Sequence, residues 1–197
     1  MTHRRAIAIF VCLAALALIG VGIPQLPHDS SGGSPNTRLT AAQASALLAG
    51  SPPALAALHV QGGKLLDGGA SAFNARLAAL KGHPIVINKW ASWCVPCKEE
   101  FAAFQRVSAE YGRRVAFVGI DSEDPKRADS QAFLRSFPVS YPSYYDPSGH
   151  LGIQVTDSSF IPVTVFKPLH GRPFIYQGQL PSASRLREEV KRYALGE

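Results

Sequence analysis

The second half of the chain alternates between short apolar runs and stretches with helical spacing. Residues 85–90 and 115–120 are almost continuously apolar, which is typical of strands buried on both faces of a parallel sheet. Between them, residues 97–111 carry large apolar side chains three to four positions apart, so one face of a helix is apolar. Gly112 follows as its stop. The pattern predicts a strand, a helix and a second buried strand.

The same alternation continues toward the C-terminus. A second helix is predicted to start within Asp121–Pro125. Short strands are predicted at 141–146, 161–166 and 174–177, and a last helix at 182–194. Two strand–helix units followed by a hairpin and a helix indicate an α/β domain with a mixed central sheet flanked by helices.

The segment before these elements has weaker signals. A short helix is predicted over residues 39–48 with Thr40 as its cap, and a helical turn over 53–59. Residues 61–69 are predicted to form a turn, a short extended piece and a second turn, and residues 71–80 a helix. We assign no chemistry to this stretch.

The N-terminus has the pattern of a membrane anchor. Arg4 and Arg5 precede Ala6–Ile23, a run of 18 residues without a charge. As a helix it spans about 27 Å, close to the hydrocarbon thickness of a bilayer. A cleaved signal peptide is the alternative, although no Ala-x-Ala site follows the run. The basic residues before it predict a cytoplasmic N-terminus and an extracytoplasmic remainder.

The amino-acid composition indicates where the chain divides into an anchor, a linker and a folded domain. Pro, Ser, Gly and Asn dominate residues 24–37, which indicates a flexible tether. We therefore predict an anchor or signal at 1–25, a linker at 26–51 and the folded domain at 52–197. Lys and Arg outnumber Asp and Glu by 20 to 14, but the excess is spread along the chain. This distribution indicates a solvated surface and no nucleic-acid partner.

The cysteines carry the chemistry. Three cysteines are too few for a disulfide scaffold, and Cys12 lies apart in the apolar N-terminal run. Cys94 and Cys97 lie two residues apart, between a predicted strand and a predicted helix. A thiolate at a helix N-terminus is stabilised by unpaired backbone N–H groups and the helix dipole. We predict a reactive dithiol that cycles to a disulfide.

This arrangement resembles the membrane-anchored TlpA/ResA-like thiol-disulfide oxidoreductases of bacteria, which have the thioredoxin fold. The matching motifs cover Asn88–Glu100, Val118–Asp121 and Ile161–Phe166, in family order and within residues 84–195. The Trp-Cys-x-Pro-Cys sequence, followed about 65 residues later by a strand-opening Pro, is more specific than a lone Cys-x-x-Cys.

The resemblance implies roles for individual residues. Cys94 would be the exposed nucleophile that forms a mixed disulfide with a partner, and Cys97 would resolve it. Pro162 would be a cis-proline facing the cysteines; the alternative is a trans proline that opens an edge strand. Substrate binding is implied for four residues: Trp93, Pro96, Ile161 and Pro162. Glu100 would handle protons near the thiols, the alternative being a solvated helix carboxylate.

The chain departs from the family at three positions. Asn88 stands where thioredoxin has a titratable Asp. Lys89 stands where an aromatic residue is usual, so its charge either snorkels from a sheet face or lies close enough to favour a thiolate. Ala102 replaces a proline that commonly kinks the first helix, so we expect a straighter helix.

The resulting functional hypothesis is a thiol-disulfide oxidoreductase, without cofactor or metal, that acts outside the cytoplasm. We expect it to work as a reductant on partner proteins with disulfides or thiols, to receive electrons from a membrane donor, and to serve in cytochrome c maturation or a similar process. The main alternative is an SCO-type copper chaperone, which needs three residues between its cysteines and a downstream His. A zinc site lacks two further ligands near the pair, and a peroxiredoxin-type nucleophile sits in a different local sequence.

Overall fold

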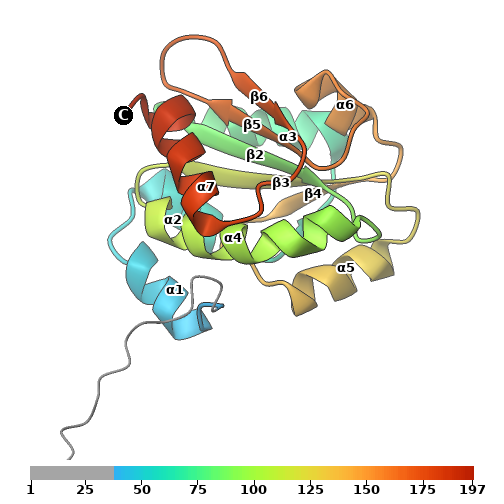
Figure 1. The fold of residues 1–197 in the computed structure, drawn as a ribbon, viewed down its shortest axis with the longest axis horizontal. Coiled ribbons are helices and arrows are strands. Elements are labelled where there is room, and N and C mark those ends of the chain that lie inside the picture. Colours follow the sequence, from blue (N-terminus) through green and yellow to red (C-terminus); the bar gives the residue numbers. More distant parts are fainter. Residues whose placement is uncertain (1–37) are drawn as a thin grey trace, which may run out of the picture. The chain divides into compact units, whose positions relative to one another are not determined.

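The computed structural model describes residues 38–197, which are built around one six-stranded mixed sheet (Figure 1). The strand order is β1-β4-β3-β2-β5-β6. The first four strands in this order run parallel, and β5 and β6 are antiparallel to their neighbours. The strands are β1 (Leu65–Leu66), β2 (Ile85–Trp90), β3 (Ala116–Ser122), β4 (Ser143–Asp146), β5 (Val163–Lys167) and β6 (Phe174–Gln177). The α/β architecture with a mixed sheet is confirmed.

Helices cover both faces of the sheet. In Figure 1, α4 and α7 lie in front of the strands and α3 lies behind them. The helices are α1 (Ala41–Leu48), α2 (Pro53–His59), α3 (Gly69–Ala79), α4 (Val95–Tyr111), α5 (Arg127–Ser136), α6 (His150–Thr156) and α7 (Ala183–Glu189), which continues into a π-helical turn, η1 (Val190–Leu195).

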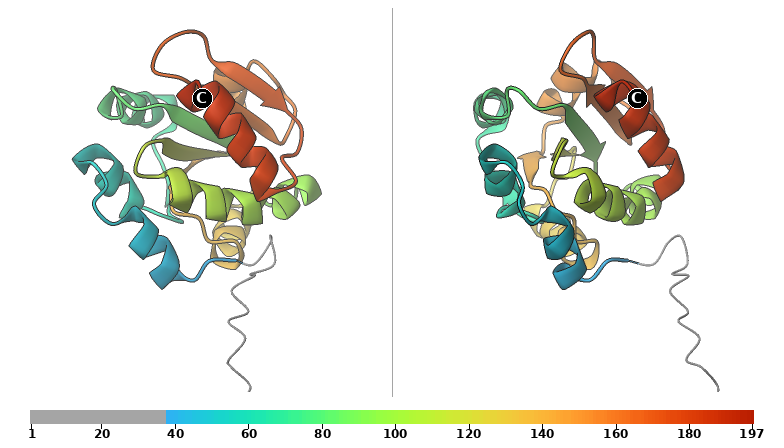
Figure 2. Two further views of the ribbon diagram at one scale, coloured as in Figure 1. Left: turned by 60° about the vertical axis from the view of Figure 1, so that its left-hand side comes forward. Right: turned by 90° about the vertical axis from the view of Figure 1, so that its left-hand side faces the viewer.

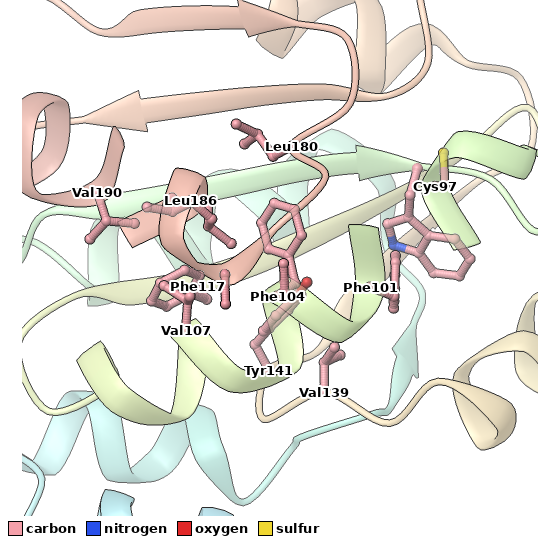
Figure 3. Close-up of a cluster of buried hydrophobic side chains, with 14 of the residues drawn as sticks. Cys97, Phe101, Phe104, Val107, Phe117, Val139, Tyr141, Leu180, Leu186 and Val190 are labelled. Carbon is pink, nitrogen blue, oxygen red and sulfur yellow. The ribbon is translucent and has the colours of Figure 1, made fainter. Parts of the chain in front are cut away.

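The central strand β2 divides the core into two clusters. Successive strand residues point to opposite faces, and all six residues of β2 are buried. Val86 and Trp90 join side chains of α4, α5 and α7 in one cluster. Figure 3 shows part of this cluster, including Phe104 of α4 and Leu186 of α7. Ile85 and Ile87 join side chains of α2, α3 and α6 in the other. Burial on both faces explains why this strand is an almost continuous apolar run.

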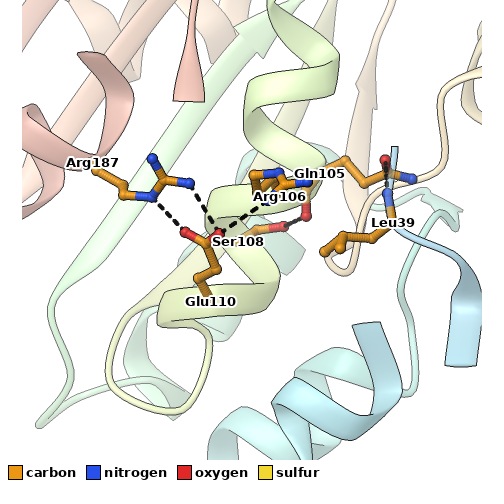
Figure 4. A network of polar contacts seen from close by, with 6 residues as sticks. All are labelled: Leu39, Gln105, Arg106, Ser108, Glu110 and Arg187. Atoms are coloured by element: carbon orange, nitrogen blue, oxygen red, sulfur yellow. Dashed lines mark hydrogen bonds and ion pairs between the residues drawn. The ribbon is translucent and has the colours of Figure 1, made fainter. Parts of the chain in front are cut away.

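Polar contacts attach the outer helices to α4 (Figure 4). Arg187 of α7 donates two hydrogen bonds to the Glu110 carboxylate, at 2.6 and 3.0 Å. The backbone N–H of Leu39, just before α1, donates to Gln105 at 3.1 Å. Helix α1 packs against α4 (Figure 2) and lies within residues 26–51, which we predicted as a linker.

Most predicted elements are present, including the Thr40 cap, whose side chain accepts from the Gln43 N–H. The predicted helix start at Asp121 is wrong, because Asp121 lies inside β3 and α5 begins at Arg127. Between them Glu123 has a φ of 64°, a left-handed conformation that no helix continues through. Helix α6 was not predicted.

Several predictions concern residues outside the described part. The proposed anchor, Ala6–Ile23, and Cys12 lie outside residues 38–197. Within these residues, no helix is long and apolar enough to cross a membrane. The domain boundaries stay predictions.

We expect Phe104→Ala to lower the free energy of unfolding by about 3–5 kcal/mol, because truncating a buried aromatic ring removes contacts and leaves a cavity. Phe104 is fully buried between α4 and the sheet. Urea denaturation at equilibrium measures the change. Val60→Ala is the control: Val60 is 76% exposed, and exposed substitutions usually change stability by less than about 0.5 kcal/mol. Equal effects of the two variants would contradict this account of the core.

Candidate active site

The two cysteines lie where β2 ends and α4 begins. A three-residue loop, Ala91–Trp93, connects the strand to Cys94, which is the N-cap residue of α4. Cys94 and Cys97 form a disulfide. The backbone N–H of Cys97 donates to the Cys94 sulfur at 3.2 Å. This contact and the dipole of the 17-residue helix stabilise a thiolate at Cys94 once the disulfide is reduced.

The cysteines differ little in exposure. Cys94 is 3% exposed and Cys97 is fully buried. Cys94 is thus not exposed in this disulfide form, contrary to the prediction, because its side chain is part of the core cluster beneath α4. Its role as the nucleophile stays a prediction. Its neighbours Trp93 and Val95 are 53% and 62% exposed. The chain on either side of Cys94 is therefore apolar and exposed.

The predicted cis-proline is also present. The peptide bond between Ile161 and Pro162 is cis. Pro162 is buried, and the partly buried Ile161 packs against the cluster that contains both cysteines. The structure thus brings together two motifs separated by more than 60 residues of chain. Phe160, the preceding residue, is 68% exposed.

Glu100 is a buried carboxyl, so the alternative of a solvated helix carboxylate is wrong. Its Oε1 accepts from the Asn88 side-chain amide and its Oε2 from the Leu180 backbone N–H, both at 3.0 Å. Tyr141 donates a long hydrogen bond of 3.5 Å to the Asn88 carbonyl oxygen. Burial raises the pKa of Glu100 to about 8, although both hydrogen bonds oppose the shift. At neutral pH Glu100 therefore holds a proton, one turn along α4 from Cys97.

Asp124 holds the loop before Cys94, and the sequence analysis did not identify it. Its two oxygens accept from the Ser92 N–H at 2.6 Å and the Ser92 hydroxyl at 2.7 Å. The backbone oxygen of the preceding residue, Glu123, accepts from the Trp93 indole N–H at 3.1 Å. The loop between β3 and α5 thus fixes the loop between β2 and α4. An acidic residue just after a buried strand was the available signal.

A second carboxyl, that of Asp121, lies close to Asp124. Asp121, near the end of β3, is fully buried, and neither of its oxygens makes a hydrogen bond of regular geometry, although Asp124 and Ser130 lie close to it. Burial raises the pKa of Asp121 to about 9; the nearby Asp124 adds to the rise and the Ser130 side chain opposes it. Asp121 is therefore protonated at neutral pH, which avoids a second negative charge beside Asp124.

Lys89 agrees with neither predicted alternative. It is fully buried, so it does not snorkel to solvent. It also points away from the thiols, because Asn88 faces α4 and the next residue along a strand faces the opposite side. On that side its ammonium donates to the Ser158 backbone oxygen at 2.8 Å.

The described residues include no group of three or more His, Cys, Asp or Glu side chains arranged to hold a metal ion. The chemistry that the site does contain is a disulfide at a helix N-terminus with a protonated buried carboxyl one turn away. Such a set of groups is suited to thiol–disulfide exchange.

Comparisons with known sequences agree with this chemistry. A model of the AhpC/TSA family matches residues 65–156. The thioredoxin-like protein YneN of Bacillus subtilis is 30% identical over 71 residues, which are 35% of this chain and 42% of the relative. The thiol:disulfide interchange protein DsbE of Allochromatium vinosum is 37% identical over 75 residues, which are 38% of this chain and 40% of the relative. The chain thus spans about two fifths of the length of these curated relatives.

Solved structures share the fold. A DsbF homologue from Corynebacterium diphtheriae is 29% identical, with a TM-score of 0.54 over 59% of this chain and 75% of that chain. A thiol:disulfide interchange protein of the thioredoxin family from Chlorobium tepidum has a TM-score of 0.53 at 22% identity, over 59% and 83% of the two chains. The predicted thioredoxin-like fold is confirmed.

We expect the buried Glu100 carboxyl to make stability depend on pH. Its pKa is about 8 in the folded protein against an ordinary value of 4.5, so between these values the folded state binds the extra proton. The free energy of unfolding then falls as pH rises through this window. Glu100→Gln removes this contribution, so its stability should improve relative to the wild type from pH 4.5 to 8.

Chemical denaturation at a series of pH values measures this difference. Any cost of misplacing the Gln amide is the same at every pH. The prediction is therefore tested by how the difference in free energy of unfolding between Glu100→Gln and the wild type changes with pH. Glu99→Gln, at the exposed neighbouring position, controls for the loss of one carboxylate. A difference that stays flat across the window would show that Glu100 has an ordinary pKa.

Proposed function

We propose, starting from the confirmed resemblance of the chain to the TlpA/ResA-like thiol-disulfide oxidoreductases, that it exchanges its Cys94–Cys97 pair with disulfides of partner proteins. One observation carries the proposal: the pair lies at the N-terminus of α4, with the Cys97 N–H directed at the Cys94 sulfur and the cis-proline segment packed beside it. Trp93, Pro96, Ile161 and Pro162 would contact the partner.

The exchange has two steps. In the reduced protein, the Cys94 thiolate attacks one sulfur of a partner disulfide; a bond forms between the two proteins and the other partner sulfur leaves as a thiolate. The Cys97 thiolate then attacks the Cys94 sulfur, which restores the internal disulfide and releases the second partner thiolate. Two electrons pass to the partner. A further turnover requires a dithiol donor, for which we propose a membrane protein.

Glu100 would handle the proton of the second step. Cys97 must lose its proton before it attacks, and it is buried where water does not reach it. Glu100 is buried on the same helix, one turn further on, and its pKa of about 8 lies close to that of a thiol, so the minor fraction of molecules in which Glu100 is ionised can accept the Cys97 proton. Asn88 cannot titrate, but its amide holds the Glu100 carboxyl in place. The proton-handling role thus falls to Glu100 in place of the thioredoxin Asp.

The finer assignments belong to the same proposal. We propose a reductant, because Ile161 before the cis-proline resembles the reducing thioredoxins. We also propose that the domain works outside the cytoplasm, attached through Ala6–Ile23, in cytochrome c maturation or a similar process. Relatives named DsbE and ResA support the oxidoreductase over the SCO-type copper chaperone.

We expect Cys94→Ser to abolish the reduction of insulin disulfides, because it removes the nucleophile. Cys97→Ser should instead accumulate mixed disulfides with the substrate, since the resolving thiol is missing. Turbidity measures insulin reduction, and non-reducing electrophoresis detects the mixed disulfides. Cys12→Ser is the matched control and should keep full activity. The proposed function is wrong if Cys94→Ser and Cys97→Ser both reduce insulin as well as the control does.

A further inference from the structure

Lys89 is a buried cation that the proposed thiol chemistry does not use. A fully buried ammonium is costly unless its surroundings compensate for lost hydration. The side chain of Lys89 runs from β2 past Gly152 of α6, where an added Cβ would come within 2.7 Å of the lysine Cε. A glycine at this position of α6 therefore leaves room for the lysine.

Negative groups surround the ammonium. The carboxylates of Glu123 and Asp146 counter the lowering of the Lys89 pKa that burial causes. Asp146 is itself nearly buried, and it accepts from the Gly152 N–H at 2.7 Å and the Ser122 hydroxyl at 3.3 Å. These carboxylates thus reduce the lowering of the Lys89 pKa but do not cancel it.

The lysine holds a segment that leads to the cis-proline. The Ser158 backbone oxygen accepts from Lys89 at 2.8 Å and from the Thr156 hydroxyl at 3.1 Å. The Ser158 hydroxyl accepts from the backbone N–H of Phe160 at 3.1 Å. Ile161 and Pro162 follow directly. Ser158 is therefore fixed at its carbonyl by Lys89 and in turn fixes the backbone of Phe160.

We propose that Lys89 is a positioning residue for partner binding: by holding the Ser158 carbonyl from beneath the sheet, it sets the backbone of Phe160 and Ile161 beside the redox disulfide. The inference rests on the proposed function, because it assumes that the partner chain lies along this segment. Phe160, directly before Ile161, is 68% exposed, and among the described residues no ring contact holds its side chain. It is therefore free to contact an apolar residue next to the partner's cysteine.

Lys89 acts on binding and not on the thiols. Its side chain lies across the sheet from α4, and its hydrogen bond goes to the Ser158 segment. Removing the ammonium should therefore raise the KM for a disulfide substrate and leave the kcat and the reduction potential unchanged. If Lys89 only supported the fold, its replacement would lower stability without raising KM at an unchanged kcat.

The test uses Lys89→Met, which keeps the apolar stem without the donor, and Ser158→Ala, which removes the hydroxyl that holds the Phe160 N–H. The loss of one buried, charge-assisted hydrogen bond leads us to expect a rise in KM for insulin of about tenfold in Lys89→Met. Ser158→Ala should raise KM in the same direction. Lys81→Met, at an exposed lysine, controls for the loss of one positive charge.

Hydrogen exchange gives a readout that does not depend on activity. The Phe160 amide should exchange faster in Lys89→Met and in Ser158→Ala than in the wild type, because its support is loosened or removed. If Lys89→Met does not fold, Ser158→Ala alone tests the link from Ser158 to Phe160 and to KM.

The outcomes separate the two proposals. A wild type that does not reduce insulin overturns the proposed function. A wild type that does, with KM and Phe160 exchange unchanged in the folded variants, overturns the role of Lys89. A lower kcat or a shifted reduction potential in Lys89→Met, at unchanged KM, also contradicts the inference.

Discussion

The site depends on the burial of β2 on both faces of the sheet. A strand in this position has no solvent-facing side, so its two consecutive polar residues, Asn88 and Lys89, must find partners within the protein. They point in opposite directions: Asn88 donates to Glu100 of α4, and Lys89 donates to Ser158. One strand thereby holds the helix that carries the cysteines and the segment that precedes the cis-proline.

Protonated carboxyls are the second feature of the site. Glu100 and Asp121 have pKa values raised to about 8 and about 9, in both cases mainly by burial. They differ in their contacts. Glu100 is held by two hydrogen bonds and lies one turn from Cys97, which suits a group that exchanges protons with a thiol. Asp121 lies close to Asp124, whose carboxylate accepts hydrogen bonds from Ser92 and so fixes the loop before Cys94.

The sequence predicted the features that depend on neighbouring residues. The apolar runs, the helix after the cysteines and the cysteine pair follow from local spacing, and all are present. Of the features that depend on distant residues, the cis-proline segment beside the cysteines was implied by the family resemblance, and others were missed. Asp124 acquires its role from Ser92, 32 residues earlier, and Glu100 accepts from Leu180, 80 residues later. Strand alternation predicts that the Lys89 side chain points to the face opposite Asn88. Its hydrogen bond to the Ser158 backbone oxygen could not be predicted, because Ser158 is distant in the sequence.

The reduction potential of the Cys94–Cys97 couple tests the central claim most directly, by equilibration of the protein with thiol–disulfide buffers of known potential. The account predicts one reversible two-electron transition near that of thioredoxin, roughly −270 mV. A couple that shows no reversible transition would contradict thiol–disulfide exchange. A potential near roughly −120 mV would contradict the assignment as a reductant.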